Sequence, residues 1–250
     1  MKIKSILVSQ PQPAESEKNP YLELGKKHGI KVDFFKFIKI EGVESKEFRK
    51  DRIHFNEFTA VIFTSRNAVD HYFRMAKELR FEVPDTMKYF CLTESTAFYL
   101  QKYIQYRKRK IFHGKQEFTE LLDVIKKHKT EKYLLPCSDI SKNEIPKLLD
   151  KHLIEYKKAI IYKTVESDLS AIDIVKYDLL IFFSPAGVKS LFKNFPEFDQ
   201  GEILIGAVGP STAKAVKDAG LNCNLQAPTK TAPSMTMALE QFIEKNCKKK

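Results

Sequence analysis

Hydroxyl-bearing turns that lead from apolar runs into helical patterns are the feature of this sequence best suited to chemistry. The clearest example is 177–221, which contains YDLLIFFSPAGVKSLF and then ILIGAVGPSTAKAVKDAGL. In each half a buried-strand pattern ends in a small turn, at 184–187 and 209–212, and a helical pattern follows. Such turns present backbone N–H groups and the positive end of a helix dipole, which favour carboxylates and phosphates. Because the carboxyl ends of parallel strands face one crevice, we predict an anion-binding site there.

Apolar periodicity predicts alternating strands and helices along the chain, which is typical of an α/β protein. Strands are expected at 3–8, 32–40, 58–63, 89–92, 133–136, 158–165, 179–183 and 203–208. Helices are expected at 21–28, in part of 41–56, and at 68–79, 97–104, 116–127, 145–153, 188–192, 213–219 and 234–246.

The sequence also repeats. VIFTSRNAVDHYF at 61–73 matches LIFFSPAGVKSLF at 180–192, with Ser65 opposite Ser184. CLTESTAFYLQKYI at 91–104 matches AVGPSTAKAVKDAG at 207–220, with Thr96 opposite Thr212, and 22–40 matches 146–164. The same order of elements in both halves indicates a duplicated α/β unit, and hence two similar α/β domains with a cleft between them.

These hydroxyls have a plain structural alternative, because Ser or Thr just before a helical pattern is the ordinary N-cap. Four such turns facing one cleft favour a role in binding beside the capping role.

Composition restricts the class of protein. The 250 residues are 43% hydrophobic and carry a net charge of +11. No run approaches the roughly 18 apolar residues of a membrane span, and the N-terminus is typical of a strand and not of a signal peptide, so we expect a cytoplasmic protein. The cysteines, Cys91, Cys137, Cys223 and Cys247, form no CxxC pair, which favours reduced thiols over a disulfide framework or zinc site. The basic runs 106–110 and 248–250 accompany no nucleic-acid-binding motif, so we interpret them as solvated surface.

Several motifs, taken in order, resemble the uroporphyrinogen-III synthase family over nearly the whole chain. They are FTSRNAV (63–69), STA (95–97), LPCSD (135–139), IIYKTV (160–165), FFSPAGV (182–188), AVGPSTAKAVKDAGL (207–221) and PSMTMALEQFI (233–243). The resemblance implies two flavodoxin-like or Rossmann-like parallel-sheet domains joined by a two-stranded antiparallel linker, with linker strands at about 34–42 and 158–167. Domain 1 would comprise 1–37 plus 166–250, and domain 2 the inserted 38–165.

The resemblance also implies a reaction. The family closes the linear tetrapyrrole hydroxymethylbilane to uroporphyrinogen III with loss of water and inversion of ring D, through an azafulvene and a spiro intermediate. No metal or organic cofactor takes part. The substrate carries eight carboxylates. Without the enzyme it closes with no inversion of ring D and gives the type I isomer. The expected partners are this substrate and, transiently, the upstream deaminase, with no nucleic acid or membrane and a monomeric state.

By the same resemblance Tyr162, on the second linker strand, is the candidate general acid, because a phenol stays protonated at neutral pH. Its alternative is an ordinary strand tyrosine. The candidate substrate-binding residues are Ser65, Thr96, Ser138, Ser184, Gly209 and Thr212. No metal ligand is predicted. Two other functions are weighed: a non-catalytic two-domain protein that binds a small anion, and nucleic-acid binding, which rests on charge alone.

Overall fold

The computed structural model describes residues 3–14, 18–115 and 117–247, without the side chains of 246 and 247. The chain divides into two compact units, Met1–Lys39 with Val165–Lys250, and Ile40–Thr164. The predicted domain boundaries, at 37/38 and 165/166, stay a prediction. Among the described residues no helix is both long enough and apolar enough to cross a membrane.

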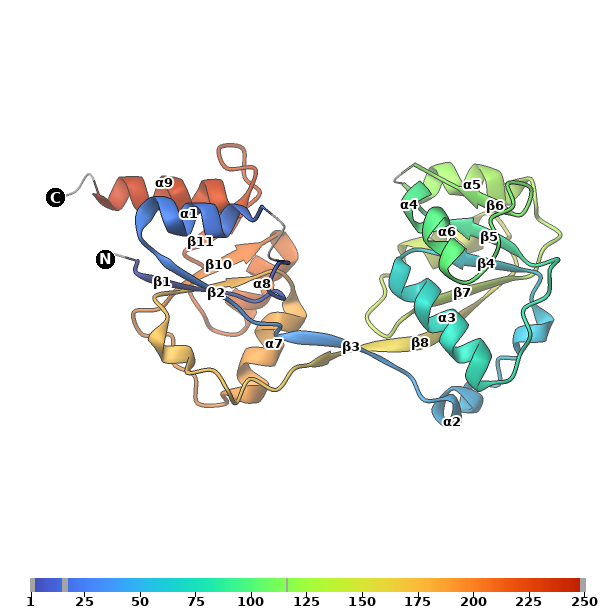
Figure 1. Ribbon diagram of the computed structural model, residues 1–250, viewed down its shortest axis with the longest axis horizontal. Helices are drawn as coiled ribbons and strands as arrows, with labels where there is room; N and C mark the ends of the chain where they lie inside the picture. Colours follow the sequence, from blue (N-terminus) through green and yellow to red (C-terminus); the bar gives the residue numbers. More distant parts are fainter. Residues whose placement is uncertain (1–2, 15–17, 116, 248–250) are drawn as a thin grey trace. The chain divides into compact units, whose positions relative to one another are not determined.

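The first unit is a parallel sheet between two layers of helices (Figure 1). Its described strands lie in the order β11-β10-β9-β1-β2. Their bounds are β1 Ser5–Val8, β2 Lys31–Phe34, β9 Leu179–Phe182, β10 Leu204–Val208 and β11 Leu225–Ala227. The helices are α1 Pro20–His28, α7 Pro185–Asn194, α8 Pro210–Asp218 and α9 Met235–Cys247, with a 3-10 turn η4 at Ile174–Lys176.

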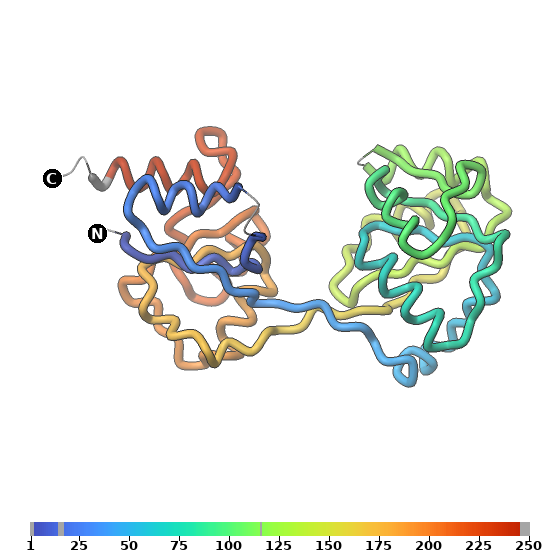
Figure 2. The backbone as a smooth tube through the Cα atoms, viewed as in Figure 1, coloured from blue at the N-terminus to red at the C-terminus, as the bar shows by residue number. Residues whose placement is uncertain are grey.

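Alternate residues of each strand pack on opposite faces. Ile6 and Ile181 contact the layer of α1 and α9, whereas Leu7 and Leu180 contact that of α7 and α8. A parallel sheet covered on both faces requires apolar residues at successive positions, which explains runs such as LLIF. The helices α1 and α9, from the N-terminal and C-terminal segments of the unit, lie side by side (Figure 2). Lys27 of α1 pairs with Glu240 of α9.

The second unit repeats this design with described strands in the order β3-β8-β7-β4-β5-β6. The strands are β3 Ile38–Gly42, β4 Ala60–Phe63, β5 Lys88–Cys91, β6 Ile111–His113, β7 Tyr133–Ser138 and β8 Tyr156–Glu166. The helices are α2 Ser45–Phe48, α3 Arg66–Glu78, α4 Glu94–Tyr99, α5 Phe118–Lys126 and α6 Glu144–Lys151, with 3-10 turns η1 Arg49–Asp51, η2 Phe55–Glu57 and η3 Leu100–Lys102. One face packs on α3 and α4 and the other on α5 and α6.

Two backbone hydrogen bonds show the direction in which β3 and β8 pair. Val43 N donates to Ile161 O at 3.0 Å, and Ser167 N donates to Phe37 O at 2.9 Å. As residue numbers rise along the first segment they fall along the second, which is the antiparallel sense.

The expected continuous strand at 32–40 is wrong, because the chain leaves β2 at Phe34 and begins β3 at Ile38. Phe37, between them, is buried in the core of the first unit, and its carbonyl accepts from the Ser190 hydroxyl at 2.6 Å. Burial of this side chain outweighs the local preference for an extended run.

Four helices begin two or three residues earlier than predicted, at Arg66, Glu94, Pro185 and Pro210, because the residues assigned to turns form the first helical turn. The predicted helix at 116–127 is α5; its first residue lies outside the described residues. The short strands β6 and β11 were not predicted, since three residues are too few for a periodic signal.

Candidate functional site

Four of the predicted residues lie at one edge of the second unit's sheet. Tyr162 is on β8, Ser138 ends β7, Ser65 follows β4 and Thr96 follows β5. These strands are neighbours in the order β8-β7-β4-β5, and they run parallel. Their carboxyl ends therefore place the four residues along a single edge.

Ser65 has two contacts there. It is the N-cap of α3, where its hydroxyl accepts from Ala68 N at 3.2 Å. The same oxygen lies 3.5 Å from the Tyr162 hydroxyl. The capping alternative therefore holds for Ser65, and it does not prevent contact with the candidate acid. The two residues are 97 positions apart, so packing alone brings them together.

Tyr162 is 8% exposed and lies opposite Ser138 on β7, next to a register shift. Burial raises the pKa of its phenol above the ordinary value, and the contact with the Ser65 hydroxyl only partly offsets this. The phenol is consequently protonated at neutral pH, which a proton donor requires. Its ring stacks on His71, with centroids 5.1 Å apart and an interplanar angle of 21°.

Thr96 is 4% exposed, and its hydroxyl lies 3.0 Å from that of Thr93. The N-cap of α4 is Thr93, whose hydroxyl accepts from Thr96 N at 3.3 Å. Thr96 is thus the third helical residue and not the cap. Its role in substrate binding stays a prediction.

The remaining predicted residues lie at the corresponding edge of the first unit's sheet. Ser184 caps α7 and accepts from Gly187 N at 3.3 Å, as Ser65 does in α3. A Cβ atom at Gly187 would lie 3.7 Å from the Ser9 hydroxyl oxygen and 3.8 Å from that of Ser184. Ser9 follows β1, the neighbour of β9, so two hydroxyls flank this glycine.

Gly209 and Thr212 complete this edge. Gly209 is the N-cap of α8 with φ 84° and ψ 154°, a region of backbone space open essentially to glycine alone. Thr212 is 1% exposed and is the third helical residue, which is the position of Thr96 in α4. The sequence repeat therefore extends to the position of single residues within the helix starts.

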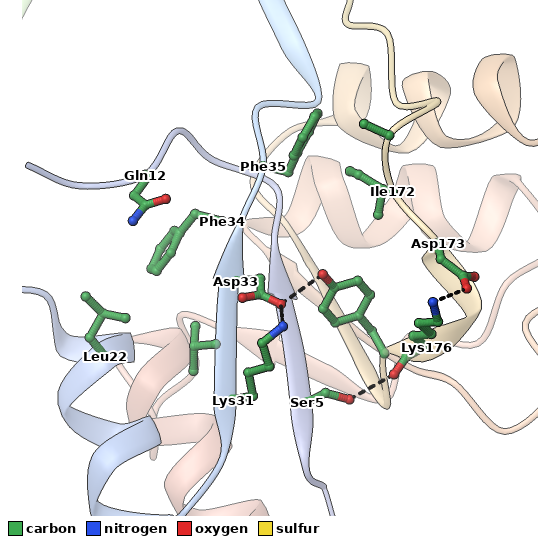
Figure 3. Close-up of a pocket in the computed structure, with 13 residues that line it drawn as sticks. Ser5, Gln12, Leu22, Lys31, Asp33, Phe34, Phe35, Ile172, Asp173 and Lys176 are labelled. Carbon is green, nitrogen blue, oxygen red and sulfur yellow. Dashed lines mark hydrogen bonds and ion pairs between the residues drawn. The ribbon is translucent and has the colours of Figure 1, made fainter.

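The described residues also line a groove of about 600 Å³ beside the edge strand β2 (Figure 3). Within it Asp33 pairs with Lys31 at 2.7 Å and accepts from the Tyr177 hydroxyl at 2.9 Å, and Lys176 pairs with Asp173 at 2.8 Å. These charges are already neutralised. The groove is lined by none of the seven predicted site residues, so we do not assign it to the candidate site.

The described residues hold no group of three or more His, Cys, Asp or Glu side chains able to bind a metal ion. Cys91 and Cys137 are buried free cysteines, and Cys223 is a half-buried one.

A family model described as uroporphyrinogen-III synthase HemD matches residues 19–237. The chain belongs to the uroporphyrinogen-III synthase family. This is a family of enzymes of tetrapyrrole biosynthesis, and it implies a tetrapyrrole substrate. A sequence search of curated proteins returns no match.

Two solved structures support the fold. Uroporphyrinogen-III synthetase from Helicobacter pylori 26695 is 19% identical, with a TM-score of 0.58 over 97% of this chain and 99% of that chain. A mutant uroporphyrinogen III synthase from the extremely thermophilic bacterium Thermus thermophilus is 14% identical, with a TM-score of 0.53 over 99% and 100%. The predicted class, two α/β units with parallel sheets, is confirmed.

Sequence reasoning missed His71 and Arg74, which contact each other; His71 also stacks on Tyr162. Their spacing of three residues on α3 indicates a shared helix face. Nothing in the local sequence indicates that this face meets β8.

Proposed function

We propose that this protein is a uroporphyrinogen-III synthase, a hydro-lyase that closes hydroxymethylbilane to uroporphyrinogen III with inversion of ring D and loss of water. The observation that carries the proposal is the family match over residues 19–237. The non-catalytic alternative is not favoured, because the matched family is one of enzymes.

In the proposed reaction the protein has two tasks. The first is to hold a flexible octacarboxylate in one geometry. Helix starts offer N–H groups without intrahelical partners within each unit, after β4 and β5 in the second unit and after β9 and β10 in the first. The second is to assist the loss of hydroxide. Tyr162 is the proposed proton donor, supported by its protonated, buried phenol and its position beside Ser65.

Selection of geometry accounts for most of the catalysis under this proposal. The substrate closes without help to the type I isomer, so the protein must favour attack at the substituted carbon of ring D over attack at the free one. Holding reacting atoms in a near-attack arrangement is the effect that supplies this preference.

The test is an isomer assay. Hydroxymethylbilane is incubated with the purified protein, the products are oxidised, and the type I and type III isomers are separated. We expect type III in excess over a control with heat-inactivated protein. Product no richer in type III than that control would reject the function.

The finer expectations about partners and location belong to the same proposal. We expect a cytoplasmic monomer that contacts the upstream deaminase only transiently. Sedimentation of the purified protein at the mass of a dimer would reject the monomeric state.

A further inference from the structure

Arg74 lies on the face of α3 that meets the strands β3 and β8. Its Nη2 donates to Val43 O at 2.9 Å and to Ile161 O at 3.0 Å. The second carbonyl belongs to the peptide that links Ile161 to Tyr162. Arg74 therefore holds the backbone immediately before the proposed proton donor.

The same guanidinium determines the state of His71. Arg74 Nε donates to His71 Nδ1 at 3.2 Å. An arginine side chain has no acceptor and stays protonated, so Nδ1 must be the acceptor and the imidazole proton must lie on Nε2. Burial, and then the positive charge of Arg74, lower the pKa of His71 and keep the ring neutral.

The fixed His71 ring in turn constrains Tyr162, because the two rings stack with their centroids 5.1 Å apart. Arg74 thus reaches the phenol by two routes, through the Ile161 carbonyl and through the imidazole ring. The distance from the Tyr162 hydroxyl to Ser65 is 3.5 Å, the outer limit of a hydrogen bond, so a small displacement of the phenol would break this contact.

Gly42 gives independent support for the position of the Arg74 guanidinium. A Cβ atom at Gly42 would lie 2.6 Å from Arg74 Cζ and 2.7 Å from its Nε. The guanidinium therefore occupies the space that a side chain at position 42 would fill, and any larger residue there would displace it.

We propose that Arg74 is a positioning residue for Tyr162, which it holds through the Ile161 carbonyl and through His71 fixed as the Nε2-protonated tautomer. The catalytic consequence rests on the function proposed above. The structural part, the tautomer, does not depend on that function.

The test compares Arg74→Lys with Gly42→Ala. Lysine at position 74 keeps the positive charge but lacks Nε and the paired Nη atoms of the guanidinium. Alanine at position 42 displaces the guanidinium of Arg74 without removing it. Lys77→Gln, an exposed change on the same helix, is the matched control. Nitrogen-15 chemical shifts of His71 report its tautomer without substrate, and the rate of type III formation reports kcat and KM.

We expect an Nε2-protonated His71 in the wild type and in Lys77→Gln, and a mixture of tautomers in Arg74→Lys and Gly42→Ala. In both test variants kcat should fall by about 100-fold with KM nearly unchanged, the effect expected of a misplaced catalytic group. An arginine with a merely structural role would leave kcat of the folded variants unchanged.

Contrary outcomes separate the proposals. A folded variant that keeps the wild-type tautomer, or one that changes the tautomer at an unchanged kcat, overturns the positioning role. If one variant does not fold, the other still decides. A wild-type protein without type III synthesis rejects the proposed function, and the nitrogen-15 spectra then still test whether Arg74 fixes His71.

Discussion

At the scale of single residues, the phenol of Tyr162 combines burial with a neighbouring hydroxyl. The raised pKa keeps the proton in place at neutral pH, and it also makes the phenol a reluctant acid. In the proposed reaction, the hydroxide that leaves the substrate must therefore receive a hydrogen bond, and then the proton, in one well-defined geometry. Ser65 and His71 both contact Tyr162, and under this proposal they would hold that geometry.

Replacing Tyr162 by Phe should lower kcat for type III formation by about 100-fold or more, because general acid catalysis contributes at least that much. The ring stays, so the fold should be unaffected. Tyr156→Phe on the same strand is the matched control. Unchanged turnover in Tyr162→Phe would leave the residue an ordinary strand tyrosine.

Asp178 connects the starts of β1 and β9 through one oxygen. Its Oδ2 accepts from Lys4 N at 2.7 Å, Ser5 N at 2.9 Å and the Ser5 hydroxyl at 3.0 Å. Burial alone would raise the pKa of this carboxyl, but the three hydrogen bonds outweigh it and the pKa is lowered. The ionised carboxylate thus stabilises the fold above the unfolded-state pKa, and this contribution is lost as pH falls through the folded-state value.

We expect Asp178→Asn to reduce the free energy of unfolding by about 1–3 kcal/mol at neutral pH. The difference from the wild type should begin to shrink below the unfolded-state pKa of about 4, and it should shrink further as the pH falls through the lower folded-state pKa, where the wild-type carboxylate also becomes protonated. Urea denaturation at several pH values measures both effects, with the exposed Asp51→Asn as control. A difference that is constant with pH would show that ionisation of Asp178 does not contribute.

At the scale of elements, the sheet edge of each unit carries helix starts of two kinds. Ser65 and Ser184 cap α3 and α7 with their hydroxyls, whereas Thr96 and Thr212 lie buried at the third helical position of α4 and α8. The cap of α8 is Gly209, which has no side-chain hydroxyl. Only its backbone can act there, and its conformation is the property to test.

Gly209→Ala should destabilise the protein more than Gly29→Ala, although a Cβ atom meets no atom within 4 Å at either position. Gly29 has φ 66° and ψ 38°, the left-handed helical region, where alanine costs about 1–2 kcal/mol. Gly209 lies in the region open essentially to glycine, for which we expect about 3 kcal/mol. Thermal and urea unfolding measure the loss of unfolding free energy in the two variants. Equal losses would show that the ψ angle of Gly209 adds no cost beyond that of a positive φ.

At the scale of the whole molecule, the protein carries a net charge of +11, which is opposite in sign to the eight carboxylates of the proposed substrate. Charges act on such a ligand at long range, and salt screens them. The basic run 106–110 ends just before β6, which starts at Ile111. It therefore lies at the amino-end edge of the second sheet, opposite the edge that carries Ser65 and Thr96.

Raising the ionic strength should increase KM for hydroxymethylbilane by about tenfold while kcat changes little, because screening weakens attraction of the substrate and not the chemical step. Steady-state rates in increasing KCl measure this. Replacing Lys108 and Arg109 by Gln should leave most of the salt dependence in place, since this run lies at the opposite edge. A KM independent of salt would contradict the electrostatic contribution, and loss of the dependence in the double variant would place substrate near the run.

Local sequence determined the α/β class, the repeat and the hydroxyls at the helix starts, because strand and helix periods and capping residues act over a few neighbouring positions. Tertiary structure alone decided which of these residues meet. Phe37 interrupts a run of good strand formers because its ring is buried in the first unit's core. Ser65, His71 and Arg74 converge on Tyr162 from a helix about 90 residues earlier in the chain. Such contacts depend on how a helix face packs on a strand. The packing is determined by the burial of many side chains from distant parts of the chain, so it cannot be predicted from a short stretch of sequence.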